Sequence, residues 1–271
     1  MKFSLLSLVA GNAICNAICP FCISKMTPAV GVSTRKPEID WRNFHKAALL
    51  ASRSDTQTVM ITGKGEPTIF PDQITDYLEA LQKYKFPFIE LQTNGILLQQ
   101  REAQYLPFLE RWHDLGLTTI SISVVHYEAE ANRKIYLPSA SSYIDLPGLI
   151  NLLHENDYTV RLSVTLCSGY IDSPYNLESM IAFSKDHAVE QLAIRPVTKI
   201  HESSDSEVHK WITTHEISVE RLHEIGNWVR ERGTHLFTYP HGAELFDIHG
   251  QNICITNCLT QSIGSSEVRQ L

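Results

Sequence analysis

The stretch KFSLLSLVAGNAICNAICPFC, from Lys2 to Cys22, joins a short apolar run to three closely spaced cysteines. Residues 2–9 are apolar enough to form a buried strand that leads directly into the cysteine loop. Cys15, Cys19 and Cys22 lie too close together to build a disulfide framework in a chain of 271 residues. Clustered thiols in a reducing compartment more often bind metal. The stretch therefore predicts a metal centre at the end of the first strand.

The composition is that of a soluble globular protein, with 43% hydrophobic and 20% charged residues. A chain of this length accommodates one large α/β domain with a small appendage. The net charge of −7 provides no attraction to nucleic acid or to an anionic membrane. No apolar run reaches the length of a membrane span, and Lys2–Ala10 is short for a signal peptide and interrupted by serines. We therefore expect a cytoplasmic protein with neither a membrane nor a nucleic-acid partner.

Apolar runs alternate with amphipathic segments along most of the chain. The predicted strands are residues 2–9, 57–62, 88–93, 117–125, 158–166 and 191–197. Their apolar character predicts burial on both faces. Six strands that alternate with helices predict the α/β class, as a partial (β/α)6 barrel with parallel strands and outer helices. In such barrels the chemistry lies at the carboxyl ends of the strands.

The intervening apolar residues recur at the spacing of a helix face. A helix after Pro37 is expected to place Trp41, Phe44, Ala48 and Ala51 on one apolar face, and Pro107 is expected near the first turn of its helix. The other predicted helices begin at Pro71, follow Pro147, contain Leu177–Ser184 and run from Ser218 to Gly233.

The alternation weakens beyond the sixth strand. Residues 199–215 are polar and irregular, which predicts a mobile loop or lid. Residues 244–248 and 252–256, joined by a turn at His249-Gly250-Gln251, predict a small C-terminal β-hairpin. We expect three regions: a barrel core over 1–200, a loop and last helix over 201–235, and a hairpin extension over 236–271.

The C-x3-C-x2-C spacing of the three cysteines suits an iron–sulfur cube. Each of three thiolates can ligate a different iron, which leaves the fourth iron open to a chelating cofactor. A zinc ion usually takes four ligands in two matched pairs, and the chain has no second C-x2-C. A zinc site, or thiols without a shared role, is the alternative.

With Phe21 before the last cysteine, this loop resembles the signature of the radical S-adenosylmethionine (SAM) superfamily. The resemblance implies a [4Fe–4S] cluster on Cys15, Cys19 and Cys22, with SAM chelating the open iron through its amino and carboxylate groups. It also implies an electron donor such as flavodoxin or ferredoxin, and reductive cleavage of SAM to a 5′-deoxyadenosyl radical.

The second predicted strand ends in Thr62-Gly63-Lys64-Gly65-Glu66-Pro67, which resembles a longer form of the family's glycine–glycine–glutamate motif. Glycines let the backbone approach a ligand, and Glu66 is expected to accept hydrogen bonds from the SAM ammonium group. Lys64 departs from the family pattern, in which glycine is common. Its side chain is expected either in solvent or directed at a substrate anion.

The later strand ends supply further polar residues. Asn94 follows the third strand in a Thr-Asn-Gly element that resembles the family's, although a simple turn explains the pair equally well. Ser121 and Ser123 share one face of the fourth strand, where a hydroxyl suits SAM or is satisfied by backbone. Buried arginines need anionic partners, and Arg195 is preferred to Arg161 for this role. The expected SAM-binding residues are Phe21, Gly63, Lys64, Gly65, Glu66, Asn94, Ser121, Ser123, Ser163 and Arg195.

Three cysteines remain outside this set. Cys167 follows the fifth strand and is the favoured candidate for a catalytic redox or hydrogen-donor thiol. Cys254 and Cys258 lie in the predicted hairpin, in a context similar to auxiliary-cluster extensions of some radical SAM enzymes. They are expected either to hold a second iron–sulfur cluster or to act as small buried hydrophobic residues.

These features favour a radical SAM enzyme that abstracts hydrogen from a small molecule or a peptide residue, in natural-product or cofactor biosynthesis. One alternative is an activase that makes a glycyl radical on a partner protein, against which the hairpin argues if it covers the barrel mouth. Another alternative is a non-catalytic iron–sulfur or zinc-binding module.

Overall fold

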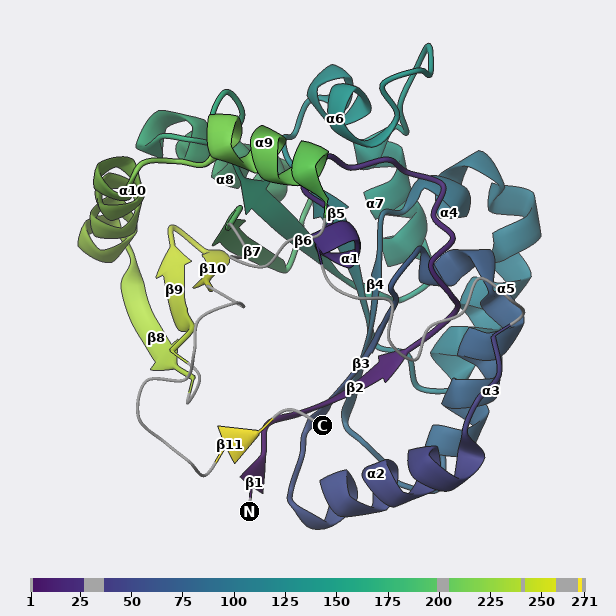
Figure 1. Ribbon diagram of the computed structural model, residues 1–271. Coiled ribbons are helices and arrows are strands. Elements are labelled where there is room, and N and C mark those ends of the chain that lie inside the picture. The colour runs from purple at the N-terminus through teal and green to yellow at the C-terminus, as the bar shows by residue number, and fades with distance from the viewer. Residues whose placement is uncertain (1, 27–36, 199–204, 240–241, 257–267, 270–271) are drawn as a thin grey trace.

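The computed structural model describes the chain except for residues 1, 27–36, 199–204, 240–241, 257–267 and 270–271. Within the described chain, one curved sheet has nine strands in the order β2-β3-β4-β5-β6-β7-β10-β9-β8. Strands β2 to β7 are parallel, and the sheet stays open between its edge strands β2 and β8 (Figure 1). The α/β class and the partial barrel are confirmed.

The strands of this sheet are β2 (Leu5–Val9), β3 (Thr58–Thr62), β4 (Phe88–Thr93), β5 (Thr119–Val124), β6 (Thr159–Leu166), β7 (Gln191–Pro196), β8 (Thr234–Thr238), β9 (Glu244–Ile248) and β10 (Gln251–Ile255). A separate parallel pair joins β1 (Lys2–Phe3) to β11 (Val268–Arg269). The longer helices are α2 (Trp41–Arg53), α3 (Pro71–Leu81), α5 (Glu102–Asp114), α7 (Leu146–Glu155), α8 (Pro174–Asp186), α9 (Ser206–His215) and α10 (Val219–Arg232). The shorter ones are α1 (Ile23–Met26), the 3-10 turn η1 (Pro67–Ile69), α4 (Ile96–Gln100) and α6 (Ala129–Tyr136).

The two faces of the parallel strands have opposite character, because successive side chains point to opposite sides of a sheet. The outer face packs under the helices and is apolar; Ile61, Leu91, Ile122, Leu162 and Ile194 are all buried there. The inner face carries polar side chains that hydrogen-bond to one another, among them Gln92, Ser121, Arg161 and Gln191. The expected apolar character is therefore wrong for the inner face, where the buried residues include Glu90 and Ser121.

Two details of the predicted helices differ from expectation. Trp41 is 42% exposed, because it is the first residue of α2 and only its edge reaches the ring of buried Phe44, 5.6 Å away. Pro107 lies inside α5 rather than in its first turn, since the helix begins at Glu102.

Helices α6 and α9 occupy segments for which no helix was predicted. The expected loop over 199–215 is wrong for residues 206–215, which form α9; residues 199–204 lie outside the described residues. The Asp205 carboxylate caps this helix by accepting from the amides of Glu207 and Val208, both at 3.1 Å. Val208 and Ile212, one turn apart, are buried beneath it.

The predicted hairpin is present as β9 and β10, joined by a turn in which His249 and Gly250 have positive φ angles. Its second strand, β10, pairs in parallel with β7, so the hairpin continues the barrel sheet and does not form a cap over its mouth. The expectation that the hairpin covers the barrel mouth, and thereby argues against a protein substrate, is thus wrong. None of the described helices combines the length and apolarity needed to cross a membrane.

Candidate active site

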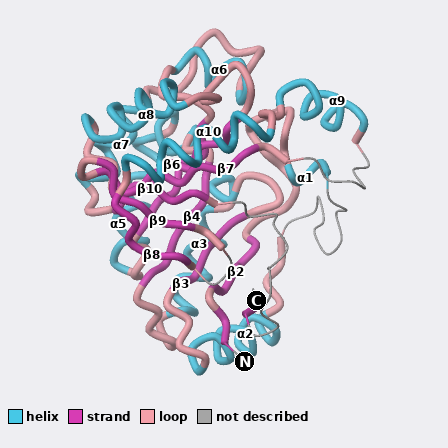
Figure 2. The backbone as a smooth tube through the Cα atoms, turned by 90° about the vertical axis from the view of Figure 1, so that its left-hand side faces the viewer, coloured by secondary structure: helices cyan, strands magenta, loops and turns pink. Residues whose placement is uncertain are grey.

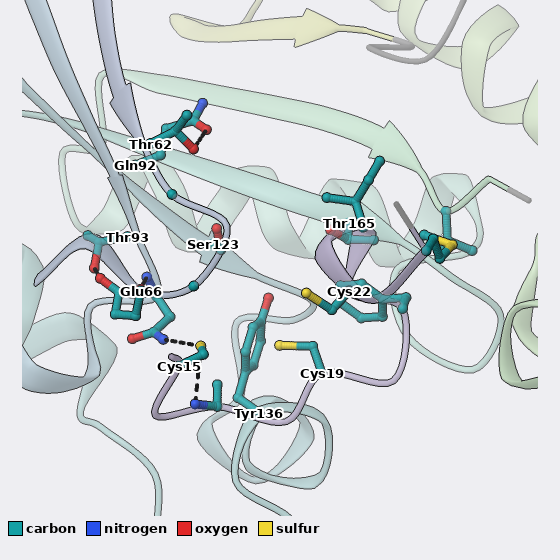
Figure 3. Close-up of a pocket in the computed structure, with 18 of the residues that line it drawn as sticks. Cys15, Cys19, Cys22, Thr62, Glu66, Gln92, Thr93, Ser123, Tyr136 and Thr165 are labelled. Atoms are coloured by element: carbon teal, nitrogen blue, oxygen red, sulfur yellow. Dashed lines mark hydrogen bonds between the residues drawn. The ribbon is translucent and has the colours of Figure 1, made fainter. Parts of the chain in front are cut away.

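A pocket opens where the carboxyl ends of β3 to β7 meet the cysteine loop (Figure 3). From the predicted site, its lining includes Cys15, Cys19, Phe21, Cys22, Gly63, Gly65, Glu66, Asn94, Ser123 and Arg195. Five separate segments of the chain therefore converge at one place. The predicted residues Lys64, Ser121, Ser163, Cys167 and Cys254 are not part of this lining.

The cysteine loop follows β2 and is shaped by its own backbone and side-chain hydrogen bonds. The amide of Ala17 donates to Cys15 Sγ at 3.4 Å, and the amide of Cys22 donates to the Cys19 carbonyl at 3.3 Å. Burial, with the neighbouring thiols of Cys22 and Cys15, raises the pKa of Cys19 to about 12. The thiol is therefore neutral without metal, and metal binding must displace its proton.

The three thiols of Cys15, Cys19 and Cys22 border one pocket without forming a preformed site for a single ion. Among the described residues, no three His, Cys, Asp or Glu side chains converge on one metal position, as a tetrahedral zinc site needs. A cube separates its irons, so three thiolates that each bind a different iron need not converge on one point. In the view of Figure 3 the Cys15, Cys19 and Cys22 side chains lie around the Tyr136 ring.

Gly65 allows the loop after β3 to dock on the cysteine loop. The Gly65 amide donates to the Asn12 carbonyl at 2.9 Å, and the next amide, of Glu66, donates to the Ile14 carbonyl at 3.0 Å. A Cβ atom on Gly65 would overlap the Ile14 carbonyl group. The close approach that requires glycine here is thus made by the chain's own backbone, whereas the sequence indicated a ligand.

Glu66 is buried, and its carboxylate joins the loops after β3 and β4. Its Oε1 accepts hydrogen bonds from the Thr68 amide at 3.1 Å, the Thr68 hydroxyl at 2.7 Å and the Thr93 hydroxyl at 2.6 Å. Its Oε2 accepts from the Asn94 amide at 2.9 Å. Burial raises the pKa of Glu66, and these hydrogen bonds oppose that rise. Most acceptor positions of this carboxylate are thus already occupied by the protein.

Asn94 links the end of β4 to the cysteine loop. Its Nδ2 donates to Asn16 Oδ1 at 2.7 Å and lies 3.9 Å from Cys15 Sγ, while its Oδ1 accepts from the Ile96 amide at 3.0 Å. The following Gly95 has a φ of 73°, which glycine adopts without strain. The side chain is therefore fixed beside the cysteines, as well as forming part of a turn.

A hydrogen-bonded layer crosses the barrel interior next to the pocket. Arg161 pairs with the Glu90 carboxylate and donates to Gln191 Oε1 at 3.1 Å and to Ser121 Oγ at 3.4 Å. Gln92 extends the layer, since its Nε2 donates to Glu90 Oε1 at 3.2 Å and its Oε1 accepts from the Thr62 hydroxyl at 3.3 Å. Arg161 thus has an anionic partner within the protein.

The remaining predicted residues lie around the pocket without lining it. Lys64 Nζ donates to the Ser24 carbonyl at 3.3 Å, at the start of α1. Cys167 is buried, and its thiol lies 3.8 Å from the Thr165 carbonyl. Cys254, on β10, pairs in register with Ala193 of β7, and Cys258 lies outside the described residues. The catalytic role of Cys167 stays a prediction.

Tyr136 is the main pocket residue that the sequence did not indicate. It ends α6 and is 2% exposed, and its hydroxyl has no hydrogen-bond partner among the described residues. Asn132, Ile135 and Tyr136 recur at helical spacing, which is a signal for the helix but not for the direction of the tyrosine. Thr93 and Thr165 also line the pocket and were not predicted.

The comparisons with known proteins agree with this fold. The family model described as the radical SAM superfamily matches residues 12–166, which is more than half of the chain. The chain therefore belongs to the radical SAM superfamily. Membership implies a [4Fe–4S] cluster and SAM as cofactors, and enzymatic activity. No curated protein sequence matches the chain.

Several solved structures share the fold at low sequence identity. SuiB of Streptococcus suis aligns over 95% of this chain and 50% of its own, with 13% identity and a TM-score of 0.61. Methylornithine synthase (PylB) aligns over 84% and 63%, with 10% identity and a TM-score of 0.56. The enzyme anSMEcpe, solved with bound AdoMet, aligns over 85% and 61%, with 13% identity and a TM-score of 0.54. The chain thus spans about half to two thirds of the length of these structures.

Proposed function

We propose that this protein reductively cleaves SAM at a [4Fe–4S] cluster held by Cys15, Cys19 and Cys22, and uses the resulting 5′-deoxyadenosyl radical to abstract hydrogen from an organic substrate. The convergence of these cysteines with Gly63, the loop at Gly65–Glu66 and Asn94 on one pocket carries this proposal. The cofactors supply the radical chemistry, and the protein supplies position and exclusion of water.

The roles of the pocket residues follow from their contacts. The glycine–glutamate loop is held against the cysteine loop by two backbone hydrogen bonds, so a ligand bound at one loop contacts a surface fixed by the other. Arg195 and Ser123 line the same pocket and are suited to the carboxylate and hydroxyl groups of SAM. Phe21 adds an apolar ring to the pocket, and the centroid of this ring lies 5.5 Å from that of the Trp211 ring in α9.

For the substrate, we propose a small molecule or a residue within a peptide. SuiB, which shares the fold, has been solved bound to the precursor peptide SuiA, and this supports the peptide class. Gln92, which belongs to the polar layer around Arg161 and Glu90, also lines the pocket, and this suits a substrate with polar groups. A cytoplasmic location, a flavodoxin or ferredoxin electron donor and a second cluster at Cys254 and Cys258 stay predictions.

Anaerobic reconstitution tests this function. We expect about four irons per chain and formation of 5′-deoxyadenosine from SAM under reductant. The matched control is Cys19→Ser, which removes one ligand and is expected to lose both. A cluster-loaded protein that forms no 5′-deoxyadenosine would contradict the proposal and favour a non-catalytic iron–sulfur module. A glycyl radical detected on an added partner protein would favour the activase.

A further inference from the structure

The buried polar atoms that lack a partner gather around the cysteine loop. Within the described residues they are Asn16 Nδ2 and the hydroxyl groups of Tyr136 and Tyr143. Asn16 belongs to the loop itself, and both tyrosines lie within electrostatic range of Cys19. Buried donors without an acceptor are rare in folded proteins, and each requires an explanation. Of the three residues, only Tyr136 lines the pocket, so an acceptor bound there could reach its hydroxyl group.

Tyr136 is the best placed of these donors. It lines the pocket, and in the view of Figure 3 its ring stands between Cys15 and Cys19 with the hydroxyl directed toward the Cys22 sulfur. The ring of Phe21 meets it edge-on, with 6.5 Å between centroids, and Tyr143 stacks on it at 6.0 Å. These aromatic contacts hold the ring in one orientation.

The backbone around Tyr136 is also fixed. Its carbonyl accepts from the Ile18 amide of the cysteine loop at 3.1 Å. One turn earlier in α6, the buried Asn132 side chain accepts from the Val125 amide at 2.9 Å and donates to the His126 carbonyl at 2.6 Å. The helix is thereby locked to the end of β5 and to the cysteine loop. A hydroxyl held this firmly without a partner is positioned for a bound group.

We propose that the Tyr136 hydroxyl donates a hydrogen bond to a sulfur atom of the cluster and thereby raises its reduction potential. This inference rests on the cluster site of the proposed function. Cluster sulfurs and cysteine thiolates accept hydrogen bonds, and donors to them stabilise the more negative, reduced state. Tyr136 thus makes the cluster easier to reduce through direct contact with it.

The test compares Tyr136→Phe with wild type in the reconstituted full-length protein. The matched control is Tyr158→Phe, since the Tyr158 hydroxyl is also buried but donates to the Leu109 carbonyl at 2.6 Å. Cluster reduction is followed by absorbance and electron paramagnetic resonance in a redox titration without SAM. We expect Tyr136→Phe to shift the midpoint potential of the cluster to more negative values. The shift should correspond to a decrease of about fivefold in the equilibrium constant for cluster reduction, which is the effect of losing one ordinary hydrogen bond. Tyr158→Phe should leave the potential unchanged.

The melting temperatures of the metal-free proteins provide a second readout, in which the control variant and not Tyr136→Phe is expected to lose stability. Because the Tyr136 hydroxyl lacks a partner, Tyr136→Phe should leave the melting temperature of the metal-free protein unchanged or higher, whereas Tyr158→Phe should lower it. A loaded Tyr136→Phe protein with the wild-type potential would overturn the inference. If that variant does not load iron, wild type grown with 3-fluorotyrosine replaces it: its more acidic phenols should raise the potential, and an unchanged potential would equally overturn the inference. Failure of the proposed function would give a different result. The cluster-loaded wild type would form no 5′-deoxyadenosine, while Tyr136→Phe would still shift the midpoint potential.

Discussion

The backbone amide of Glu66 donates a hydrogen bond to the carbonyl of Ile14 at 3.0 Å, directly beside the first cysteine of the loop. Through this bond and the one from Gly65 to Asn12, the glycine–glutamate loop forms one wall with the cysteine loop. The Glu66 carboxylate extends the wall to Thr93 and Asn94 after β4. The cysteine loop, Gly65, Glu66 and Asn94 are thus parts of one hydrogen-bonded unit.

Gly65→Ala should separate the two loops. The added Cβ would overlap the Ile14 carbonyl group, so the backbone must move, at a cost of about 1–3 kcal/mol in unfolding free energy. We also expect a lower iron content after reconstitution, because Cys15 follows Ile14. Urea denaturation of the metal-free protein and iron analysis measure the two effects. The control, Gly226→Ala within α10, meets only the flexible end of Arg230 and should not reduce either value.

Glu66→Gln should uncouple the loops after β3 and β4. The Glu66 carboxylate accepts hydrogen bonds from Thr68, Thr93 and Asn94. The glutamine side chain replaces one of the two accepting oxygens with an NH2 donor, so at least one buried donor loses its acceptor. We expect a loss of about 1–3 kcal/mol in stability. A double-mutant cycle with Thr93→Val tests the mechanism in chemical denaturation. Strictly additive effects of the two changes would show that Glu66 and Thr93 do not act together.

Glu90→Gln should leave the Arg161 guanidinium without its anionic partner inside the barrel. The Glu90 side chain is 7% exposed and that of Arg161 is 25% exposed. We expect a loss of about 2 kcal/mol, less than the roughly 3–5 kcal/mol of a fully buried pair. Glu79→Gln is the matched control, because Glu79 pairs with Arg111 on the surface, where both side chains are about half exposed. Its change in denaturation should stay within about 0.5 kcal/mol.

Cys254→Ala with Cys258→Ala decides whether a second cluster exists. The charged neighbour of the Cys254 thiol is Arg161, and burial raises the pKa of this thiol, so the described structure gives it the surroundings of a barrel-lining residue. We therefore expect both wild type and the double variant to hold about four irons per chain. Wild type with about eight irons, falling to about four in the variant, would instead establish the second cluster.

The sequence by itself predicted the parallel α/β barrel, because strand and helix periodicity repeat within short segments. It also identified the cysteine loop and the glycine–glutamate element, since each is written in consecutive residues. The helices that escaped prediction include α9, which has a capping aspartate and a short apolar stripe, and α6, which spans only 129–136. Both signals are short and lie between polar residues, so periodicity alone did not separate them from loops.

The partners of the site residues were decided only by the tertiary structure. The sequence assigned Glu66 to a ligand, but in the fold its carboxylate accepts hydrogen bonds from Thr68, Thr93 and Asn94. The sequence required an anionic partner for Arg161, and in the fold this partner is Glu90. It gave no sign that Tyr136 enters the pocket. Motifs are local, whereas Glu66 meets Thr93 and Asn94 because parallel strands align their carboxyl ends at one edge of the sheet. Arg161 of β6 meets Glu90 of β4 because these strands are both neighbours of β5. Three-dimensional strand order, rather than residue identity, therefore determined which polar groups pair with each other and which face the cluster.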